Sequence, residues 1–390
     1  MKLCSEITAR PTKQFAEAVS VRKAKGENIL SFGLGEPDFK TPEYIVDAMF
    51  KAVQDGYTHY SDAQGIAELR TLIANAATKE YGVKYTPNEV AVTPGIKSAA
   101  YSALSVILKP GDKVGLCTPC YVAYPAMIKL AEPECEILTV DLNSDYTFNM
   151  EKLEKVILSG IRVLIVNSPN NPTGAMLSSS EIERIINLCL KNDIYILSDE
   201  VYEKIVFSGS RHISFGSYEN IKERLIIANG YSKSHAMTGW RLGYALAPQD
   251  ICYKIGRLQF NTNTNVATFI QKAGCSIYDH NWDHIDRYRS ELEKRMQYFH
   301  KEINKIDGIS GIMPQGGFFY FVNIKKTGLT SNEFAAKLVL ETGIATTPGI
   351  AFGDNWDGYI RFSLAVPMEQ IEVCVNLLKK FMSVNFKKIN

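Results

Sequence analysis

The sequence lacks an excess of charge of either sign. Its 390 residues contain 43 lysines and arginines against 42 aspartates and glutamates, which leaves a formal net charge of +1. A chain so close to neutrality has no basic surface for nucleic acid and no basic segment for an anionic membrane. We therefore expect neither nucleic acid nor a membrane as a partner.

Long hydrophobic runs are also missing. No apolar stretch approaches the roughly 20 residues of a membrane-spanning helix. The first residues, MKLCSEITARPTK, lack the apolar centre of a secretory signal. We expect a cytoplasmic protein. The apolar content of 46% is enough for a large core, and the length favours two or three domains.

Cysteine is sparse, and eight in 390 residues are too few for a disulfide scaffold. Cys117 and Cys120 form a CxxC, which suits a redox pair or half of a zinc site, but no second CxxC or suitable histidine pair accompanies it. His280 and His284 in HNWDH have the spacing of two ligands on one helical face, without the glutamate of a zinc protease motif. We interpret the cysteines mostly as packed thiols and these histidines as surface residues, and we expect no metal site.

What the chain does contain is an alternation of strand and helix patterns. Seven short apolar runs are rich in branched residues and do not alternate with polar ones, which is typical of strands covered on both faces. A mostly parallel sheet in an α/β layer fold follows. The runs span 90–93, 113–117, 135–140, 162–166, 194–197, 225–228 and 242–247. Between them, 178–192 has the clearest helical pattern and begins with a capping box from Ser178 to Glu181.

The pattern changes after about residue 280. A charged helix at 284–306 leads into shorter strands at 316–324 and 358–365 and a closing helix at 369–382. We expect a large domain over 46–285 and a smaller α+β domain over 286–390, which the segment 1–45 joins.

Polar side chains follow three of the predicted strands. Asn167 and Asn171 come after the strand at 162–166, Asp199 after 194–197, and Lys233 after the strand that begins at 225. The carboxyl ends of parallel strands share one crevice, where ligands bind. A lysine shielded from water there, near other positive charge, has a depressed pKa and can condense with a carbonyl group.

The aldehyde of pyridoxal phosphate (PLP) is the carbonyl that suits these neighbours. Asp199 would keep the ring nitrogen protonated, so that the ring can take up the electrons of a carbanion. Tyr202 and Asn171 could bond the ring hydroxyl. Arg241 offers a planar fork for the phosphate, and Gly95, Ile96 and Lys97 enter a helix whose first N–H groups favour a dianion.

These motifs resemble those of class I aminotransferases, fold-type I PLP-dependent enzymes of the aspartate aminotransferase superfamily. GYSKSHAMTGWRLG, at 230–243, fits every position of the family's lysine signature, and SPNNPTG and SDEVYE match two further elements. GLGEPDF, HYSDAQGIAELR, TPGIK, TPCYVAYP and YIRFSLA fall in family order, so the likeness covers nearly the whole chain.

The resemblance implies the fold of a fold-type I transferase and an activity. Lys233 would form the internal aldimine with PLP and then move the proton as general base and acid. Asp199 would pair with the ring nitrogen, and Tyr202 and Asn171 with the ring hydroxyl. The reaction would move an amino group from an amino acid to a 2-oxo acid by a ping-pong mechanism.

The resemblance also implies cofactor and substrate contacts. Tyr121 would stack on the ring, Ser232 would lie beside the lysine as a cofactor contact, and Tyr60 would reach the phosphate of the neighbouring subunit, which implies a homodimer with shared active sites. Arg361 would clamp the substrate α-carboxylate, with Gly35 and Asn171 nearby.

Two departures from the family pattern bear on substrate and cofactor. Gly230 stands where many relatives have a phosphate-binding serine. The helix after the TPG turn, SAAYSALSVIL, has no cation for a distal carboxylate, so Lys13 or the partner subunit would have to supply one. Aromatic, neutral and unusual amino donors stay open.

Two other functions are alternatives. The same fold also carries other PLP reactions, such as a β-elimination that cleaves C–S bonds. PLP-binding regulatory modules fused to DNA-binding domains are disfavoured by the neutral charge and by the lack of a helix-turn-helix extension.

Overall fold

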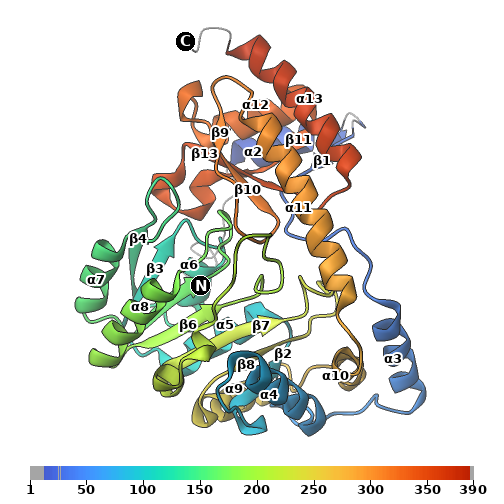
Figure 1. Ribbon diagram of the computed structural model, residues 1–390, viewed down its shortest axis with the longest axis vertical. Coiled ribbons are helices and arrows are strands. Elements are labelled where there is room, and N and C mark those ends of the chain that lie inside the picture. Colours follow the sequence, from blue (N-terminus) through green and yellow to red (C-terminus); the bar gives the residue numbers. More distant parts are fainter. Residues whose placement is uncertain (1–12, 25, 27, 387–390) are drawn as a thin grey trace.

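The computed structural model describes residues 13–24, 26 and 28–386, and its central feature is a seven-stranded sheet (Figure 1). The strand order is β2-β8-β7-β6-β5-β3-β4. β8 is antiparallel to both of its neighbours, and the remaining pairs are parallel. The strands are β2 Val90–Thr93, β3 Lys113–Thr118, β4 Glu136–Asp141, β5 Val163–Asn167, β6 Tyr195–Asp199, β7 Leu225–Gly230 and β8 Gly243–Leu246. All seven predicted strands are confirmed, and none of their ends differs from the prediction by more than two residues.

Both faces of this sheet are covered by helices, which explains the unbroken apolar runs. In β5, Leu164 and Val166 join one core cluster, whereas Val163 and Ile165 join another on the opposite face. The helices α5 Ile96–Ile107, α6 Tyr124–Ala131 and α9 Gln249–Thr262 cover one face. The other face packs against α4 Ala67–Tyr81, α7 Met150–Leu158, α8 Ser179–Lys191 and α10 Thr268–Cys275. The capping box predicted from Ser178 to Glu181 is present at the start of α8.

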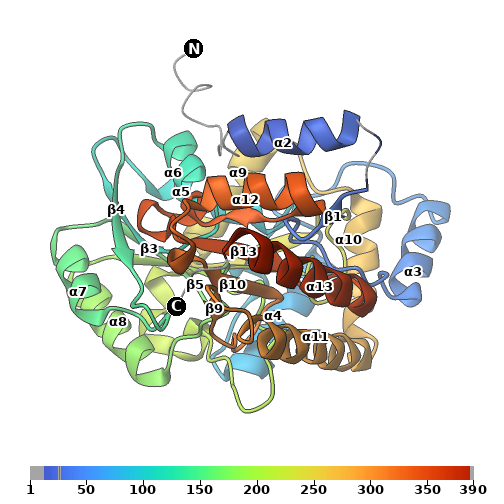
Figure 2. The same cartoon turned by 90° about the horizontal axis from the view of Figure 1, so that it is seen from above.

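A smaller α+β part lies above the large sheet (Figures 1 and 2). Its four-stranded sheet has the order β12-β13-β10-β9, and its core is a separate apolar cluster. The elements are β9 Ser310–Gly311, β10 Phe319–Asn323, β12 Thr347–Pro348, β13 Tyr359–Ser363, α11 Asp283–Ile303, α12 Ser331–Thr342 and α13 Met368–Asn385. The fold class expected from the sequence, α/β with a mostly parallel sheet and a smaller α+β part, is confirmed.

The amino-terminal segment belongs with both parts. α2 Lys13–Ala24 lies along α12, and β1 Leu30–Ser31 pairs in parallel with β11 Ile344–Ala345 (Figure 2). α3 Glu43–Gln54 packs instead against α10 of the large part. Domain limits at 45 and 285 remain a prediction, and residues 1–12 of the predicted first segment lie outside the described residues.

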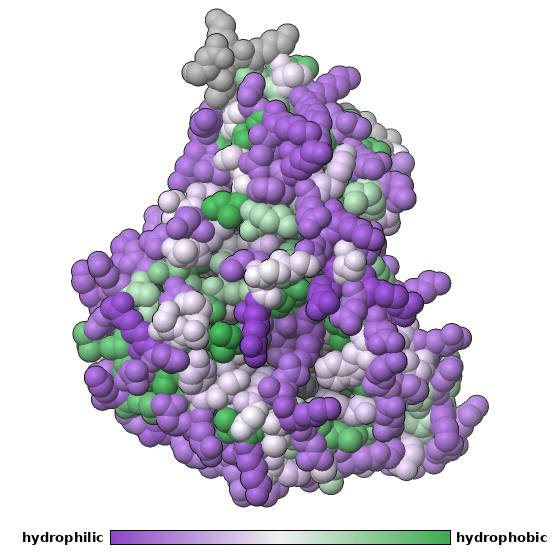
Figure 3. Space-filling model, viewed as in Figure 1, coloured by the Kyte–Doolittle hydropathy of each residue, from purple (hydrophilic) through white to green (hydrophobic). Residues whose placement is uncertain are grey.

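Hydrophilic side chains cover most of the face shown in Figure 3. Within the described ranges, no helix is long and apolar enough to cross a bilayer.

Candidate active site

A cavity of about 540 Å³ lies at the carboxyl end of the large sheet, closed above by strands of the smaller part. Of the thirteen residues predicted for the site, eleven line it: Gly35, Ile96, Lys97, Tyr121, Asn171, Asp199, Tyr202, Ser232, Lys233, Arg241 and Arg361. Gly95 is the N-cap of α5, whose first residues line the cavity. Tyr60 is not in the wall and is 86% exposed.

Lys233 follows β7 in a tight loop and reaches into the cavity. Its Nζ donates a hydrogen bond to the Gly35 carbonyl at 2.5 Å. Burial and the nearby positive charge of Arg361 lower the pKa of Lys233 to about 8. A fraction of the lysine is therefore a neutral, nucleophilic amine near neutral pH.

Asp199 ends β6, and its carboxylate is held from two sides. Its Oδ2 accepts a hydrogen bond from the Tyr124 hydroxyl at 2.6 Å, and its Oδ1 accepts one from the Val201 amide at 3.3 Å. Burial raises the pKa of Asp199 to about 6, and these two hydrogen bonds oppose the rise. Sequence reasoning missed Tyr124, although TPCYVAYP places it three residues after Tyr121, one helical turn away.

Arg361 extends from β13 into the buried wall of the cavity. Its Nη1 donates to Asn171 Oδ1 at 3.0 Å, and its Nη2 donates to the Gly33 carbonyl at 2.6 Å and to Thr347 Oγ1 at 3.1 Å. Its guanidinium carbon lies 4.1 Å from the centroid of the Phe319 ring. No described group accepts from its buried Nε, and burial lowers the pKa of Arg361 to about 10. A buried cation with no carboxylate partner is suited to bind one.

Tyr202 lies beside this arginine on the cavity wall. Burial raises the pKa of its hydroxyl, and the charge on Asp199 raises it further, so Tyr202 stays protonated as a hydrogen-bond donor. Its ring packs edge-on against Phe318 and Phe319.

The turn before α5 forms a cradle for an anion. Gly95 has a φ of +80°, and a Cβ there would collide with the Arg241 guanidinium. Arg241 is fixed by hydrogen bonds from its Nη1 to the Thr238 carbonyl at 2.9 Å and from its Nη2 to the Pro94 carbonyl at 3.2 Å. The first N–H groups of α5 have no partner within the helix, so this turn suits a phosphate.

The absence of a serine at position 230, where this chain has Gly230, has a steric explanation. A Cβ at this position would lie 2.8 Å from the Cα of Gly243 on the neighbouring strand. Serine therefore does not fit here without a shift of the backbone.

Lys97 corrects one expectation from the sequence. The helix after the TPG turn begins at Ile96 and so includes Lys97, and the prediction that it carries no cation is wrong. The Nζ of Lys97 lies 5.7 Å from the centroid of the Tyr121 ring, and none of the described carboxylates forms an ion pair with it. The side chain of Lys13, the other candidate cation, lies outside the described residues.

The loop that supplies the Gly33 and Gly35 carbonyls is anchored to both parts of the molecule. Arg295 of α11 forms an ion pair with Asp38, at 2.8 Å, and its side chain is only 7% exposed. Glu36 accepts a hydrogen bond from the Thr238 hydroxyl in the lysine loop. These contacts hold the loop against Lys233.

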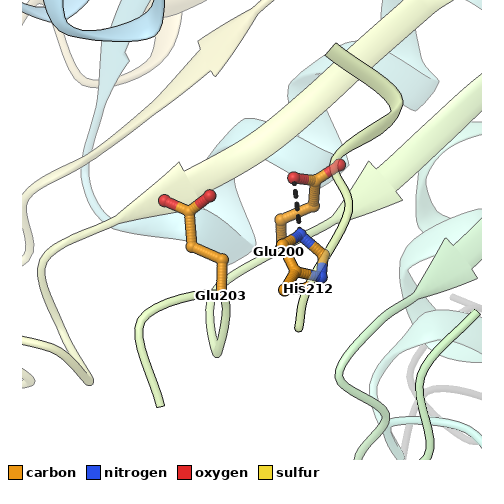
Figure 4. A group of neighbouring side chains, drawn as sticks. All are labelled: Glu200, Glu203 and His212. Carbon is orange, nitrogen blue, oxygen red and sulfur yellow. Dashed lines mark hydrogen bonds and ion pairs between the residues drawn. The ribbon is translucent and has the colours of Figure 1, made fainter. Parts of the chain in front are cut away.

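In the segment that follows β6 and the loop after it, three titratable side chains, Glu200, Glu203 and His212, lie close together, and Glu200 and His212 are hydrogen-bonded to each other (Figure 4). Glu200 accepts from Ser198 Oγ at 2.8 Å and pairs with His212 Nε2 at 3.2 Å. Glu203 accepts from Asn229 Nδ2 at 2.8 Å and from the Tyr81 hydroxyl at 3.1 Å. Since protein donors already hold both carboxylates, we interpret the cluster as a brace for the segment after β6.

Two motifs from the sequence lie outside the cavity. Cys117 and Cys120 are buried free thiols, as expected, and burial raises the pKa of Cys117 to about 12, which leaves it unreactive. The interpretation of both histidines of HNWDH as surface residues is wrong for His284, whose residue is only 5% exposed. The start of α11 turns it inward toward the lysine loop, where it meets His235.

The cavity residues fit PLP by their chemistry. A lysine with a lowered pKa, a buried carboxylate, an aromatic ring and a glycine cradle lie around one space. Together with the α/β fold, this set defines a fold-type I PLP-dependent enzyme.

Comparisons with known proteins identify the family. The family model described as aminotransferase class I and II matches residues 27–378. The chain is 37% identical over 358 residues to aromatic-amino-acid aminotransferase 2 of Thermococcus litoralis, which covers 91% of this chain and 92% of that protein. It is 36% identical to an aspartate aminotransferase of Pyrococcus abyssi, with the same coverage. It also matches the crystal structure of an aromatic aminotransferase from Pyrococcus horikoshii, with a TM-score of 0.89, 34% identity and coverage of 95% of this chain and 100% of that chain.

The chain therefore belongs to the class I and II aminotransferase family. It is a PLP-dependent aminotransferase whose substrates are amino acids and 2-oxo acids.

Proposed function

We propose that this aminotransferase takes acidic and aromatic amino donors, with Lys233 as the residue that binds the cofactor and moves the proton. The observation that carries the proposal is the shared cavity of Lys233, Asp199 and Arg361. When bound, PLP supplies a ring that accepts the electron pair left as the Cα–H bond of the substrate breaks.

Lys233 holds and releases the proton at its Nζ. With a pKa of about 8, this amine can take up and release a proton near neutral pH. The Gly35 carbonyl, which accepts from Nζ, orients the amine. The Asp199 carboxylate is the counter-ion for a protonated ring nitrogen, and the Tyr202 hydroxyl and the Asn171 amide are donors for the ring oxygen.

The remaining cofactor contacts surround this centre. Tyr121 offers its ring face for stacking. The phosphate is held by the first N–H groups of α5, at Ile96 and Lys97 after Gly95, together with Arg241 and Ser232.

Arg361 binds the α-carboxylate of the substrate. Its guanidinium is buried, has no carboxylate partner among the described residues and offers an unpaired Nε. Gly35 and Asn171, both in the cavity wall, complete this end of the site.

Lys97 is the group that we assign to the substrate side chain. Its ammonium lies over Tyr121 at the cavity wall, where it can pair with a distal carboxylate, and the aromatic face beside it can accept a ring. The relatives named aspartate and aromatic-amino-acid aminotransferases support both donor classes.

The active unit that we propose is a homodimer with shared active sites. Tyr60 is 86% exposed and belongs to a segment fixed to α9 by a hydrogen bond from Gln259 Nε2 to the Ala63 carbonyl at 2.8 Å. α9 itself exposes Tyr253 and Phe260. An exposed apolar face of this kind supports association with a second copy, whose Tyr60 would reach the phosphate.

The proposed location is the cytoplasm. The seven described cysteines are free, as expected of a protein in a reducing compartment.

A donor screen tests the proposal. The purified PLP-loaded enzyme would be incubated with each of twenty amino acids and a 2-oxo acid acceptor, and the new amino acid would be quantified. We expect the highest kcat/KM for acidic and aromatic donors. Transfer confined to small neutral donors would refute the assignment of Lys97. Release of ammonia and pyruvate from a cysteine conjugate without any acceptor would favour the alternative, a C–S β-lyase.

A further inference from the structure

The lysine loop, residues 231–242 between β7 and β8, has a strained backbone. Two of its non-glycine residues have positive φ angles, Ala236 at +51° and Arg241 at +55°. A residue with a Cβ is disfavoured in this left-handed region, so it persists there only where surrounding contacts hold it. Lys233 and Arg241, on either side of Ala236, both line the PLP cavity. The contacts that hold this loop therefore also place two of the groups proposed to bind the cofactor.

The hydroxyl of Thr41 supplies two of these contacts. Its Oγ1 donates a hydrogen bond to the Ala236 carbonyl at 2.7 Å and accepts one from Trp240 Nε1 at 3.1 Å. Ala236 is three residues beyond Lys233, and Trp240 directly precedes Arg241. One side-chain oxygen, used as donor and as acceptor, thus joins the two halves of the loop.

The place of Thr41 in the sequence suggests a different task. It stands just before α3, whose N-cap is Pro42. A hydroxyl close to a helix start commonly accepts from the first amides of that helix. The Thr41 hydroxyl instead reaches a loop 195 positions further along the chain. This choice of partner indicates that Thr41 serves the lysine loop.

The segment that leads to Thr41 is held by α11, the helix that runs from the large part into the smaller one (Figure 1). Phe39 stacks on Tyr288 of this helix, with ring centroids 4.1 Å apart and an angle of 3° between the planes. The Tyr288 hydroxyl donates to the Lys40 carbonyl at 2.6 Å. Because its own backbone is anchored in this way, the Thr41 side chain can fix a strained loop.

A second contact joins the same two segments. The Thr238 hydroxyl donates to Glu36, and the Thr238 carbonyl accepts from Arg241 Nη1 at 2.9 Å. This contact stays in place when Thr41 is changed. Loss of the Thr41 hydroxyl should therefore loosen the loop without unfolding the protein.

We propose that Thr41 is a positioning residue for the cofactor site, whose hydroxyl holds the lysine loop in the shape that brings Lys233 and Arg241 to PLP. Thr41 is not among the residues that line the cavity, so it acts through the loop. The inference rests on the proposed function, in which Lys233 binds the cofactor and Arg241 holds its phosphate.

The first test is titration of the PLP-free proteins with PLP, at a temperature at which all of them are folded. Thr41→Val keeps the shape of the side chain and removes both hydrogen bonds, so it should raise the dissociation constant of PLP by about 10-fold or more. Thr41→Ser keeps the hydroxyl and should bind PLP nearly as the wild type does. Thr71→Val is the matched control, because the Thr71 hydroxyl donates to the Ala67 carbonyl at 2.8 Å on the exposed side of α4. It should bind PLP as the wild type does.

Steady-state kinetics at saturating PLP give a second reading. Thr41→Val should lower kcat by about 10-fold. The KM for the amino donor should change little, because Lys233 moves the proton whereas Arg361 holds the α-carboxylate. A purely structural role would lower the melting temperature of Thr41→Val and leave PLP binding unchanged.

Three results would overturn the proposal. They are wild-type PLP binding by Thr41→Val, binding by Thr41→Ser that is as weak as that of Thr41→Val, and an equal loss of binding in Thr71→Val. Should Thr41→Val fail to fold, Trp240→Phe decides, because it removes only one of the two hydrogen bonds. It should weaken PLP binding by about 3-fold to 10-fold, and unchanged binding would overturn the proposal.

Borohydride labelling of the wild-type enzyme separates this inference from the proposed function. A pyridoxyl label on a residue other than Lys233 would refute the proposed function and, with it, the premise of the inference. A label on Lys233, together with wild-type PLP binding by Thr41→Val, would refute the role of Thr41 alone.

Discussion

The hydrogen bond from Tyr124 to Asp199 makes a prediction that can be worked through in numbers. The Asp199 carboxyl has a pKa of about 6, against 3.8 without the protein. A rise of about two in pKa corresponds to about 3 kcal/mol. The free energy of unfolding falls by this amount when the buried acid ionises. The native state holds the proton more tightly than the unfolded state. The contribution of Asp199 to the stability of the fold is therefore largest at low pH and falls as the pH rises from about 4 to about 6.

Tyr124→Phe removes the donor at 2.6 Å from Oδ2 and changes little else, since the ring remains. A hydrogen bond to a buried charge contributes about 1.5–3 kcal/mol. Because the protonated form loses about 1 kcal/mol as well, the pKa of Asp199 should rise further by only about 0.4–1.5. At pH 8 the variant should be less stable than the wild type by about 1.5–3 kcal/mol, whereas at pH 5, where Asp199 is protonated in both, the difference should shrink to about 1 kcal/mol.

Urea unfolding of the PLP-free proteins at pH 5 and pH 8 measures this difference without any turnover. The acid limb of the kcat profile of the loaded variant should also move to higher pH, because Asp199 must be ionised to serve as counter-ion. An equal loss of stability at both pH values, with an unmoved acid limb, would refute the coupling between Tyr124 and Asp199.

Three further predictions concern substrate and assembly. Arg361→Leu should lower kcat/KM for every amino donor by about 100-fold or more, through the loss of charge-assisted hydrogen bonds to the α-carboxylate; unchanged steady-state constants would remove Arg361 from the site. Lys97→Met should lower kcat/KM for acidic donors by about 10-fold, the effect of one partly solvated ion pair, and leave aromatic donors unaffected; an equal loss for both classes would contradict its role in recognising the side chain. The variants Tyr60→Ala and Lys233→Ala should each be nearly inactive alone. A mixture of the two should regain activity, because a mixed dimer contains one site with an intact Lys233 and an intact Tyr60. A mixture that stays inactive would argue against shared active sites.

The large sheet could be predicted because its strands are buried on both faces. A run such as Val163–Asn167 can be identified as a strand without knowledge of the neighbouring strands, because every residue in it is apolar or lies at the end of the strand. The polar residues that follow these strands could be grouped for the same reason: parallel strands bring their carboxyl ends together whatever the details of packing. Asn171, Asp199 and Lys233 were grouped in this way, and they share the cavity.

Contacts made across the two parts of the molecule could not be predicted from the sequence. Thr347 and Phe319 surround Arg361 only because the smaller sheet folds over the cavity. The hydroxyl of Tyr124 meets Asp199 because α6 packs on the sheet at a particular angle, which residue spacing does not determine. His284 is buried for a similar reason, because the first turn of α11 contacts the lysine loop. A short motif shows which side chains are neighbours along the chain. Which of them face the interior depends on tertiary packing, which the motif does not contain.

The covalent link between Lys233 and the cofactor is the central claim, and it can be measured directly. The loaded enzyme would be reduced with borohydride and digested, and the labelled peptide identified by mass spectrometry, with Lys233→Ala as the control. We predict a single pyridoxyl label on Lys233 and none in the variant. A label on another lysine, or a label that persists in Lys233→Ala, would contradict the account.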